Sequence, residues 1–468
     1  MIGWLVQDAC RSTEKLEHSA FLLAFSNQLK PNCFNLEISG KPPPPRLATT
    51  AGGNTDPALA PINNNRGSLP VNYRTAAICA SFLASGMAFA NNGDQMVGYS
   101  AITNAVGGAV VAAPLDVTTS LTNPAGLAFL KLGDRATRFD MTVSVLNPIR
   151  SMNGVESDSN AYVMATGGFA FQSELLGPDL VLGIGAYPIS GGGVDFPAAA
   201  FRLGTSNAAI VANRMSMRIG PAAAYKVNDG FSIGANLSLS LNQMSMKNMT
   251  LVPGMPPTVI SDNFPNDVAY GVSFVLGTMH KLSERTSVGL SYTSKSYNEE
   301  LVWNMDDGKW RLNFEDPQTV AIGLSHRLTD KLMLSADLKW LNYSDVRDTA
   351  TLYGPTPAKN KLIAYSWDDQ TVVALGAKYD MSDRLSIMAG YNYGASPISE
   401  EDINNNAGVT AIVEHHLSAG VTAKVSHHSA LTLSLIHGFK NEMTASVGPP
   451  TTVSFETNLL SLQFTYND

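Results

Sequence analysis

The sequence is poor in charged residues and has no long apolar run. Asp, Glu, Lys and Arg make up 15% of its 468 residues, whereas an average soluble chain carries about 25%. No stretch reaches the roughly 18 consecutive apolar residues of a membrane-spanning helix, so a helical membrane protein is not expected. The formal net charge is −8 and no basic stripe is present to meet phosphates, so we expect no nucleic-acid partner.

Cysteine is confined to the start of the chain, at Cys10, Cys33 and Cys79. The remainder therefore has no disulfide, no catalytic thiol and no zinc–thiolate site. G-x-S-x-G sequences and phosphate-binding loops are also missing. The pairs His415–His416 and His427–His428 do not suggest a metal site, because adjacent residues of a strand point to opposite faces. We expect no metal, no cofactor and no enzymatic activity.

A secretory signal peptide is predicted at residues 71–90. Arg74 precedes a run of small and apolar residues that ends at Ala88–Ala90, a small-x-small cleavage site. Cleavage would leave a polar, glycine-containing start at Asn91. Residues 1–70 are rich in loop-forming residues and have no place before a signal peptide, so we expect them to be a disordered extension from a gene-model error.

From about residue 138 to the end, apolar and small polar residues alternate with a period of two, which is the strand signature. The runs extend over roughly 10–15 residues, longer than the 5–6 typical of soluble strands and long enough to cross a bilayer at a tilt. An apolar face suits lipid, and a face of Ser, Gly, Asn and Thr suits a lumen. One such apolar face is formed by Phe231, Ile233, Ala235, Leu237, Leu239 and Leu241.

Short polar turns alternate with longer Pro-, Asn- and Gly-rich connections. Together they join 14 strands, with both ends on the short-turn side, which is the pattern of outer-membrane barrels. A β-propeller is the rival, because the turns recur roughly every 50 residues, but each period holds two long strands rather than four short ones. The turns lie at 176–179, 227–230, 282–285, 328–331, 381–384 and 425–428, and the long connections near 147–160, 191–207, 246–266, 300–310, 344–361, 394–408 and 441–451.

The sequence thus predicts an all-β fold, with a 14-stranded antiparallel transmembrane β-barrel over residues 138–468. Residues 91–137 have no sustained alternation and no place in the wall, and their small residues suit tight packing. We therefore expect this segment to form an N-terminal hatch, or plug, in the lumen.

Asp116 and the sequence Leu-Thr-Asn-Pro-Ala-Gly-Leu at 121–127 resemble the N-terminal hatch of FadL/TodX-type outer-membrane transporters of hydrophobic compounds. The resemblance covers essentially all of residues 91–468. Further matching stretches are Gly183–Phe196, Pro221–Gly234, Pro317–Asp345, Gly390–Pro397 and His416–Lys424.

The resemblance implies passive uptake of long-chain fatty acids or other hydrophobic compounds across the outer membrane of a Gram-negative bacterium. In this family, ligand is captured in an external groove, moves to a pocket against the hatch and leaves sideways through a gap in the wall. The hatch motif here is Asn123, Pro124 and Ala125 with Asp116. Its structural reading is a turn that stops a helix; its functional reading is a hatch element that moves when ligand arrives.

The matching position for the lateral gap is the third predicted strand. Proline has no ladder donor and glycine weakens a strand, so this stretch is expected to interrupt wall pairing. The alternative is that Gly191–Gly193 simply begin an external loop. The candidate gap residues are Pro188, Ser190, Gly191, Gly192 and Gly193.

Recognition of a ligand headgroup is the point where the sequence departs from the fatty-acid prototype. The positions that match its basic residues are Gln243 and Asp368, neither of which is basic. An unpaired carboxylate in an apolar pocket would be costly. Either Arg214, Arg218 or Lys247 substitutes, or the ligand is neutral, or it binds protonated. A methionine-rich segment can line an adaptable apolar entrance or simply face lipid; it comprises Met244, Met246, Met249 and Met255.

Two alternative functions remain at this point, a general aqueous porin and a barrel-embedded enzyme. The expected partners are a long-chain fatty acid or a neutral hydrophobic molecule, outer-membrane lipid and lipopolysaccharide, and the barrel insertion machinery. That machinery reads terminal aromatic residues, for which Phe464 and Tyr466 are the candidates.

Overall fold

The computed structural model describes residues 91–468 apart from 173–176, 198–199, 201–208 and 249–262. The expected extension (1–70) and signal peptide (71–90) lie outside the described residues, as do Met249 and Met255.

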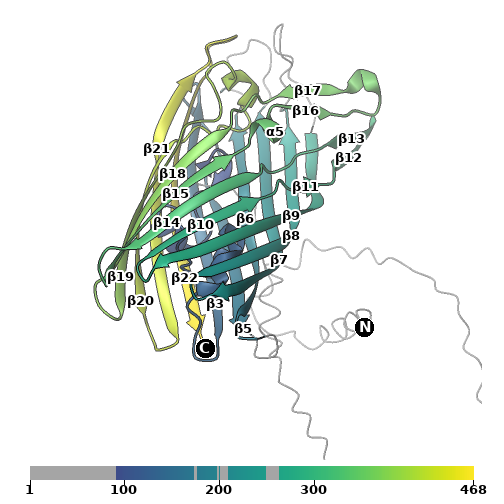
Figure 1. The fold of residues 1–468 in the computed structure, drawn as a ribbon. Coiled ribbons are helices and arrows are strands. Elements are labelled where there is room, and N and C mark those ends of the chain that lie inside the picture. The colour runs from purple at the N-terminus through teal and green to yellow at the C-terminus, as the bar shows by residue number, and fades with distance from the viewer. Residues whose placement is uncertain (1–90, 173–176, 198–199, 201–208, 249–262) are drawn as a thin grey trace, which may run out of the picture. The chain divides into compact units, whose positions relative to one another are not determined.

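Fourteen strands of the described part of the chain pair edge to edge in a closed antiparallel barrel (Figure 1). The last strand pairs with the first from Val453↔Met152 to Asn467↔Arg138, which closes the wall. The predicted fold class is therefore confirmed. The wall strands are β3 (Thr137–Met152), β5 (Tyr162–Gln172), β6 (Leu180–Phe196), β7 (Ile210–Asn228), β8 (Phe231–Lys247), β9 (Asn263–Ser283), β10 (Thr286–Thr293), β14 (Thr319–Arg327), β15 (Leu332–Leu341), β18 (Gln370–Asp380), β19 (Leu385–Gly394), β20 (His415–Lys424), β21 (Ser429–Thr444) and β22 (Thr452–Asn467).

The two faces of the wall follow the predicted alternation. In β8, Leu237 is 62% exposed whereas Ser240 is fully buried. A soluble protein would not expose such large apolar side chains along every strand, but in a bilayer they are covered by lipid. The small polar side chains face inward, where they meet the hatch and one another.

The connections alternate as expected. At the β7–β8 turn, the backbone N–H of Gly230 donates to Asn228 Oδ1 (2.9 Å), a local bond that suits a tight reversal. The backbone N–H of Thr137 donates to the Asp468 carbonyl (3.1 Å), so both ends of the barrel meet at the short-turn end. We call the opposite end, which carries the long connections, the outer end.

The outer connections contain structure of their own. A buried apolar cluster forms there, in which Phe264 packs edge-on against Trp303 (5.1 Å between ring centres) and Trp310 (5.6 Å). The elements of these connections are β4 (Val155–Glu156), β11 (Tyr297–Asn298), β12 (Leu301–Met305), β13 (Gly308–Leu312), α5 (Ser344–Arg347), β16 (Thr349–Leu352), η5 (Pro357–Lys359), β17 (Lys361–Ala364) and η6 (Ile403–Asn406).

The expected hatch segment, residues 91–137, lies inside the barrel up to residue 136, and Thr137 already belongs to β3 (Figure 1). Its helices are short, and none in the described ranges is long and apolar enough to cross a membrane. Ser100 begins the first of them with a reciprocal capping box to Thr103. Its elements are β1 (Asn91–Asn92), β2 (Gln95–Met96), α3 (Ala101–Ala105), α4 (Thr119–Thr122) and η3 (Pro124–Phe129).

A belt of inner-face glycines seats the hatch segment. A Cβ atom at any of them would lie 2.8 Å or less from a hatch atom, which is closer than real Cβ contacts come. At Gly390, for example, the added carbon would lie 2.1 Å from the Gly107 nitrogen. The hatch backbone therefore rests directly on the backbone of the wall. This glycine belt comprises Gly234, Gly277, Gly289, Gly323, Gly376, Gly390 and Gly420.

Candidate ligand-binding site

Strand β6 separates from β5 halfway along its length while it stays paired with β7. The β5–β6 ladder ends at Gly167↔Ala186, although β5 continues to Tyr162 and β6 to Phe196. The β6–β7 ladder shifts register between Pro188 and Ser190, where proline cannot donate a ladder bond. From residue 187 to 191 every residue is buried, so the alternation of exposed and buried positions stops there. This half of β6 has been drawn off the lipid-facing surface.

On the side of β6 where the ladder with β5 has ended, the hatch segment pairs with β6 instead. Gln95 pairs with Ser190, and the Gly191 backbone N–H donates to the Asp94 carbonyl (3.2 Å). The alternative reading, that Gly191–Gly193 begin an external loop, is wrong, because β6 stays paired with β7 as far as Phe196↔Ile210. The candidate gap residues thus lie inside a strand and against the hatch.

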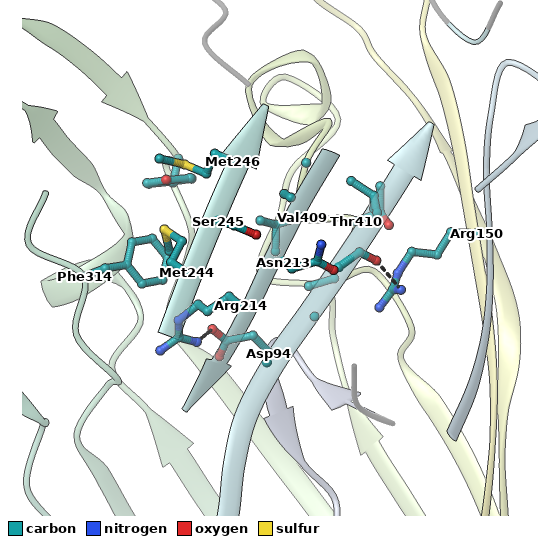
Figure 2. A pocket seen from close by; sticks show the side chains of 18 residues that line it. Asp94, Arg150, Asn213, Arg214, Met244, Ser245, Met246, Phe314, Val409 and Thr410 are labelled. Atoms are coloured by element: carbon teal, nitrogen blue, oxygen red, sulfur yellow. Dashed lines mark hydrogen bonds and ion pairs between the residues drawn. The ribbon is translucent and has the colours of Figure 1, made fainter. Parts of the chain in front are cut away.

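A pocket lies where β6, the hatch and the outer connections meet (Figure 2). Its empty space measures about 600 Å³, a figure that includes space open to solvent. Met244, Met246 and Phe314 line one end, and Arg150 and Thr410 lie at the other. Gly191, Gly192, Gly193 and Val194 of β6 also line it. We call this the β6 pocket.

A buried ionic network ties the hatch to the floor of the β6 pocket. Arg214 Nη1 donates to Asp94 Oδ2 of the hatch (2.9 Å), and its Nη2 donates to Asp316. Arg347 Nη2 also donates to Asp94 Oδ2 (3.1 Å). The Tyr343 hydroxyl donates to the Asn92 carbonyl (2.7 Å). Two guanidinium groups therefore meet two carboxylates, and the cluster is satisfied without a ligand.

Asp316, between β13 and β14, is held ionised by this network. Burial on its own raises the pKa of the carboxyl group, but Arg214 and Arg218 outweigh it, and the pKa lies below its ordinary value of 3.8. The Ser216 hydroxyl also donates to Asp316 Oδ2 (2.5 Å), which favours the charged form.

The three predicted headgroup cations do not converge. Arg214 is occupied by carboxylates. Arg218 is buried and lines a second cavity together with Lys339 and Tyr99 of the hatch. Lys247 is exposed at the end of β8.

Arg150 is the cation that the sequence analysis missed. It is 4% exposed, lines the β6 pocket and donates from Nη1 to the Gly193 carbonyl (2.8 Å; Figure 2). Its region was expected to begin an external connection, but β3 runs on to Met152. The alternation of β3 could have identified it, because Arg150 lies an even number of positions from Asp140, Thr142 and Ser144 and so shares their inner face.

Comparisons with known proteins agree with this architecture. Residues 77–429 match the family model described as outer membrane protein transport protein (OMPP1/FadL/TodX). The chain belongs to this family. Outer membrane protein P1 of Haemophilus influenzae is 26% identical over 227 residues, which cover 44% of this chain and 48% of that protein. The chain thus spans about half the length of the relatives that it matches in sequence.

Solved structures of FadL/TodX-type proteins share the fold over a longer span. The P. putida toluene transporter TodX covers 80% of this chain and 99% of its own, with 18% identity and a TM-score of 0.64. A Pseudomonas aeruginosa FadL homologue covers 80% and 100%, with 15% identity and a TM-score of 0.66. At these identities the likeness concerns the fold. Like the family, the chain is an outer-membrane β-barrel.

The hatch residues that resemble the family motif hold the hatch segment together and fix it to the wall. Asn123 Nδ2 donates to the Val111 carbonyl of the hatch (2.8 Å) and to the Thr278 carbonyl of β9 (3.0 Å). Pro124 begins η3, and the Ala125 carbonyl accepts a hydrogen bond from the Ser232 hydroxyl (2.9 Å).

Asp116, the acidic member of the hatch motif, is fully buried. It accepts hydrogen bonds from the hydroxyls of Ser100 and Thr118 (2.5 Å each) and from Gln463 Nε2 of β22 (3.1 Å). Burial and the nearby Asp140 raise the pKa of Asp116 above its ordinary value.

Proposed function

We propose that this protein is a passive outer-membrane channel for long-chain fatty acids or other hydrophobic compounds, and that it releases them sideways into the bilayer. The observation that carries the proposal is the early end of the β5–β6 ladder at Gly167↔Ala186. Beyond that pair the described ranges contain no β5–β6 ladder, and an apolar molecule inside the barrel is proposed to pass into lipid at this break without crossing water. The family, which includes a protein named a toluene transporter, is consistent with this role.

The route begins with capture in a groove at the outer end and continues to the β6 pocket against the hatch. One buried apolar cluster contains methionines from three elements: Met164 of β5, Met96 of the hatch, and Met215 and Met217 of β7. Methionine side chains are flexible and polarisable, so they adapt to ligands of different shape. We propose that these adaptable side chains give way to an apolar ligand that moves from the pocket toward β5.

The contact between the hatch and the glycine belt favours a hydrophobic-compound channel over a general aqueous porin. A porin needs an open lumen, whereas here the hatch rests on the glycine belt of the inner wall. A water-filled pore would also leave a hydrophobic ligand in contact with water, whereas its transfer from water to an apolar environment is what lowers its free energy. The Asn123–Ala125 turn is proposed to shift locally when ligand arrives, without expulsion of the whole hatch.

The proposal is tested by closing the gap with a cross-link. If the β5–β6 ladder continued, Ala165 would face Pro188, so both are replaced by cysteine and joined with a short bis-maleimide. The region 91–468 contains no cysteine of its own. The matched control is Phe169→Cys with Ile184→Cys, a pair that already faces each other in the ladder.

Uptake of a labelled hydrophobic compound by cells is then measured before and after cross-linking. We expect uptake to fall sharply in the Ala165/Pro188 variant and to stay unchanged in the control. Unchanged uptake through a fully cross-linked Ala165/Pro188 barrel would refute lateral release. Pocket occupancy is assayed separately on purified protein, because Gly191–Gly193 line the β6 pocket and substitutions there would disturb binding and release together.

A further inference from the structure

The second cavity differs from the β6 pocket in the chemistry of its lining. It is enclosed by Tyr99 of the hatch, Arg218 of β7, Ser291 of β10, Thr319 of β14 and Lys339 of β15. Most of its lining side chains carry a hydroxyl, an amide or a charge, and no methionine or phenylalanine lines it. Its empty space measures about 550 Å³, a figure that includes space open to solvent. We call this the polar cavity.

Arg218 is the buried cation of the polar cavity. Its side chain is 4% exposed, its Nε makes no hydrogen bond, and it forms no ion pair with any described residue. The nearby carboxylate of Asp316 is already engaged by Arg214 and by the Ser216 hydroxyl. Its Oδ2 also accepts a hydrogen bond from the Ser296 hydroxyl (3.2 Å). Arg218 therefore lies close to a negative charge that is directed at other groups.

A count of the buried charges leaves one positive charge over. Three guanidinium groups lie in this region, those of Arg214, Arg347 and Arg218, but only two carboxylates meet them, those of Asp94 and Asp316. Arg214 and Arg347 take both carboxylates through direct ion pairs. The excess charge thus falls on Arg218, and a buried charge without a partner is costly.

Lys339 and Asp337 do not change this balance, because they contribute one charge of each sign. The Asp337 carboxylate accepts the backbone N–H groups of Val110 (2.7 Å) and Val111 (3.0 Å) of the hatch. Lys339 donates to the Gly108 carbonyl (2.8 Å). Since an ammonium group has three donors, two of them remain beside the polar cavity.

Two buried hydroxyl groups near Arg218 also have no partner. Ser291 lines the polar cavity, is 3% exposed, and its hydroxyl oxygen makes no hydrogen bond. Ser240, which faces Arg218 in the β7–β8 ladder, is fully buried and has an unpartnered hydroxyl as well. Buried polar groups are normally satisfied. Unmet hydroxyls beside an unpaired guanidinium therefore indicate a missing ligand that is negatively charged and accepts several hydrogen bonds.

We infer that the polar cavity binds a small inorganic oxyanion, held by the guanidinium of Arg218 and the hydroxyl of Ser291, with Lys339 beside it. The fork of a guanidinium presents paired N–H donors that match two oxygens of one oxyanion. Because polar side chains predominate in the lining, the cavity suits a free ion better than an alkyl chain. The site is thus separate from the β6 pocket, and the inference does not depend on which compound the barrel transports. The bound ion balances the excess charge and links the hatch to the wall.

The test is binding of radiolabelled inorganic phosphate, measured by equilibrium dialysis on protein purified from outer membranes in an uncharged detergent. Ionic strength is held constant with sodium chloride, so that general attraction to positive charge does not count as binding. We expect saturable binding of a single phosphate per barrel. Loss of a charged donor should weaken this binding roughly ten- to a hundredfold in Arg218→Gln, and loss of a neutral donor about two- to tenfold in Ser291→Ala.

The matched control is Lys247→Gln, which removes an exposed cation of the same barrel and should leave phosphate affinity unchanged. Each variant is first checked for the heat-modifiable band of a folded barrel. If Arg218→Gln does not fold, Arg218→Lys and Ser291→Ala decide instead. Arg218→Lys keeps the charge but loses the fork, so its affinity should lie between those of the wild type and a variant without the cation.

Absence of saturable phosphate binding by the folded wild type would overturn the inference. Undiminished binding in the Arg218 and Ser291 variants, or an equal loss in Lys247→Gln, would overturn it too. Loss of binding in Arg150→Gln with retention in Arg218→Gln would place the ion in the β6 pocket and so contradict the assignment. Each of these results leaves passive uptake of hydrophobic compounds standing, because that function is measured separately by uptake into cells.

Discussion

The glycine belt leads to a quantitative prediction about closure of the lumen. Gly234 and Gly390 lie on opposite parts of the hatch seat: a Cβ at Gly234 would lie 2.3 Å from the Ala125 nitrogen, and one at Gly390 would lie 2.1 Å from the Gly107 nitrogen. Ordinary contact begins at 3.4 Å. The clashing atoms are backbone, which cannot turn aside as a side chain can. The double variant Gly234→Ala/Gly390→Ala should therefore displace the hatch.

Its energetic cost can be estimated from the two contacts. Overpacking a well-packed site costs about 1–3 kcal/mol, and the two sites touch separate parts of the hatch, so together they should cost about 2–6 kcal/mol. A shift of the hatch would also break the bonds from Asn392 Nδ2 to the Gly107 carbonyl (3.1 Å) and from Ser232 to Ala125. The barrel ladders do not depend on these bonds, so the wall should still form.

The assay is ion conductance of single proteins in planar bilayers, with heat-modifiability on gels to verify the barrel. We expect the wild type to conduct little and the double variant to open a pore. The matched control is Gly167→Ala on β5, where the nearest atom to an added Cβ is the Asp140 carbonyl oxygen at 3.7 Å. A folded double variant that conducts no more than the wild type or Gly167→Ala would refute the view that the belt seats the hatch.

Three further predictions concern the barrel seam, the ionic network and the hatch turn. Replacing Phe464 and Tyr466, which are exposed on the closing strand, by Ser should lower the yield of the heat-modifiable band; an unchanged yield would contradict their role in assembly. Because the pKa of Asp316 is depressed in the folded state, its contribution to stability is complete above its ordinary value of 3.8 and is lost as pH falls below it. Thermal unfolding of Arg214→Gln, followed from pH 5 down to pH 2, should lose that part of the dependence, and an identical profile would argue against the pair. Asn123→Ala leaves two carbonyls without their donor and should destabilise the hatch by about 1–3 kcal/mol per group, measured as earlier proteolysis of residues 91–137; equal protection would count against this anchor.

Local patterns in the sequence were enough to determine the wall. Period-two alternation identifies the lipid-facing and lumen-facing sides of a strand, as Leu237 and Ser240 illustrate, because each residue's direction follows from that of its neighbour. Turn residues such as Asn228 and Gly230 satisfy their own backbone groups, so they mark reversals without reference to the rest of the chain. Even the interruption of β6 had a local cause in Pro188.

Only the tertiary structure decided how the interior is used. Arg214 was a candidate for a ligand carboxylate, but Asp94 and Asp316 lie 120 and 102 residues away in sequence and reach it through the hatch and an outer connection. Arg150 has no such carboxylate partner among the described residues, so the two arginines differ in their surroundings and not in any pattern of the sequence. The glycine belt likewise follows from where the hatch backbone comes to rest. Strand direction and turns are properties of neighbouring residues, whereas the charge balance of a buried pocket depends on segments that only the closed barrel brings together.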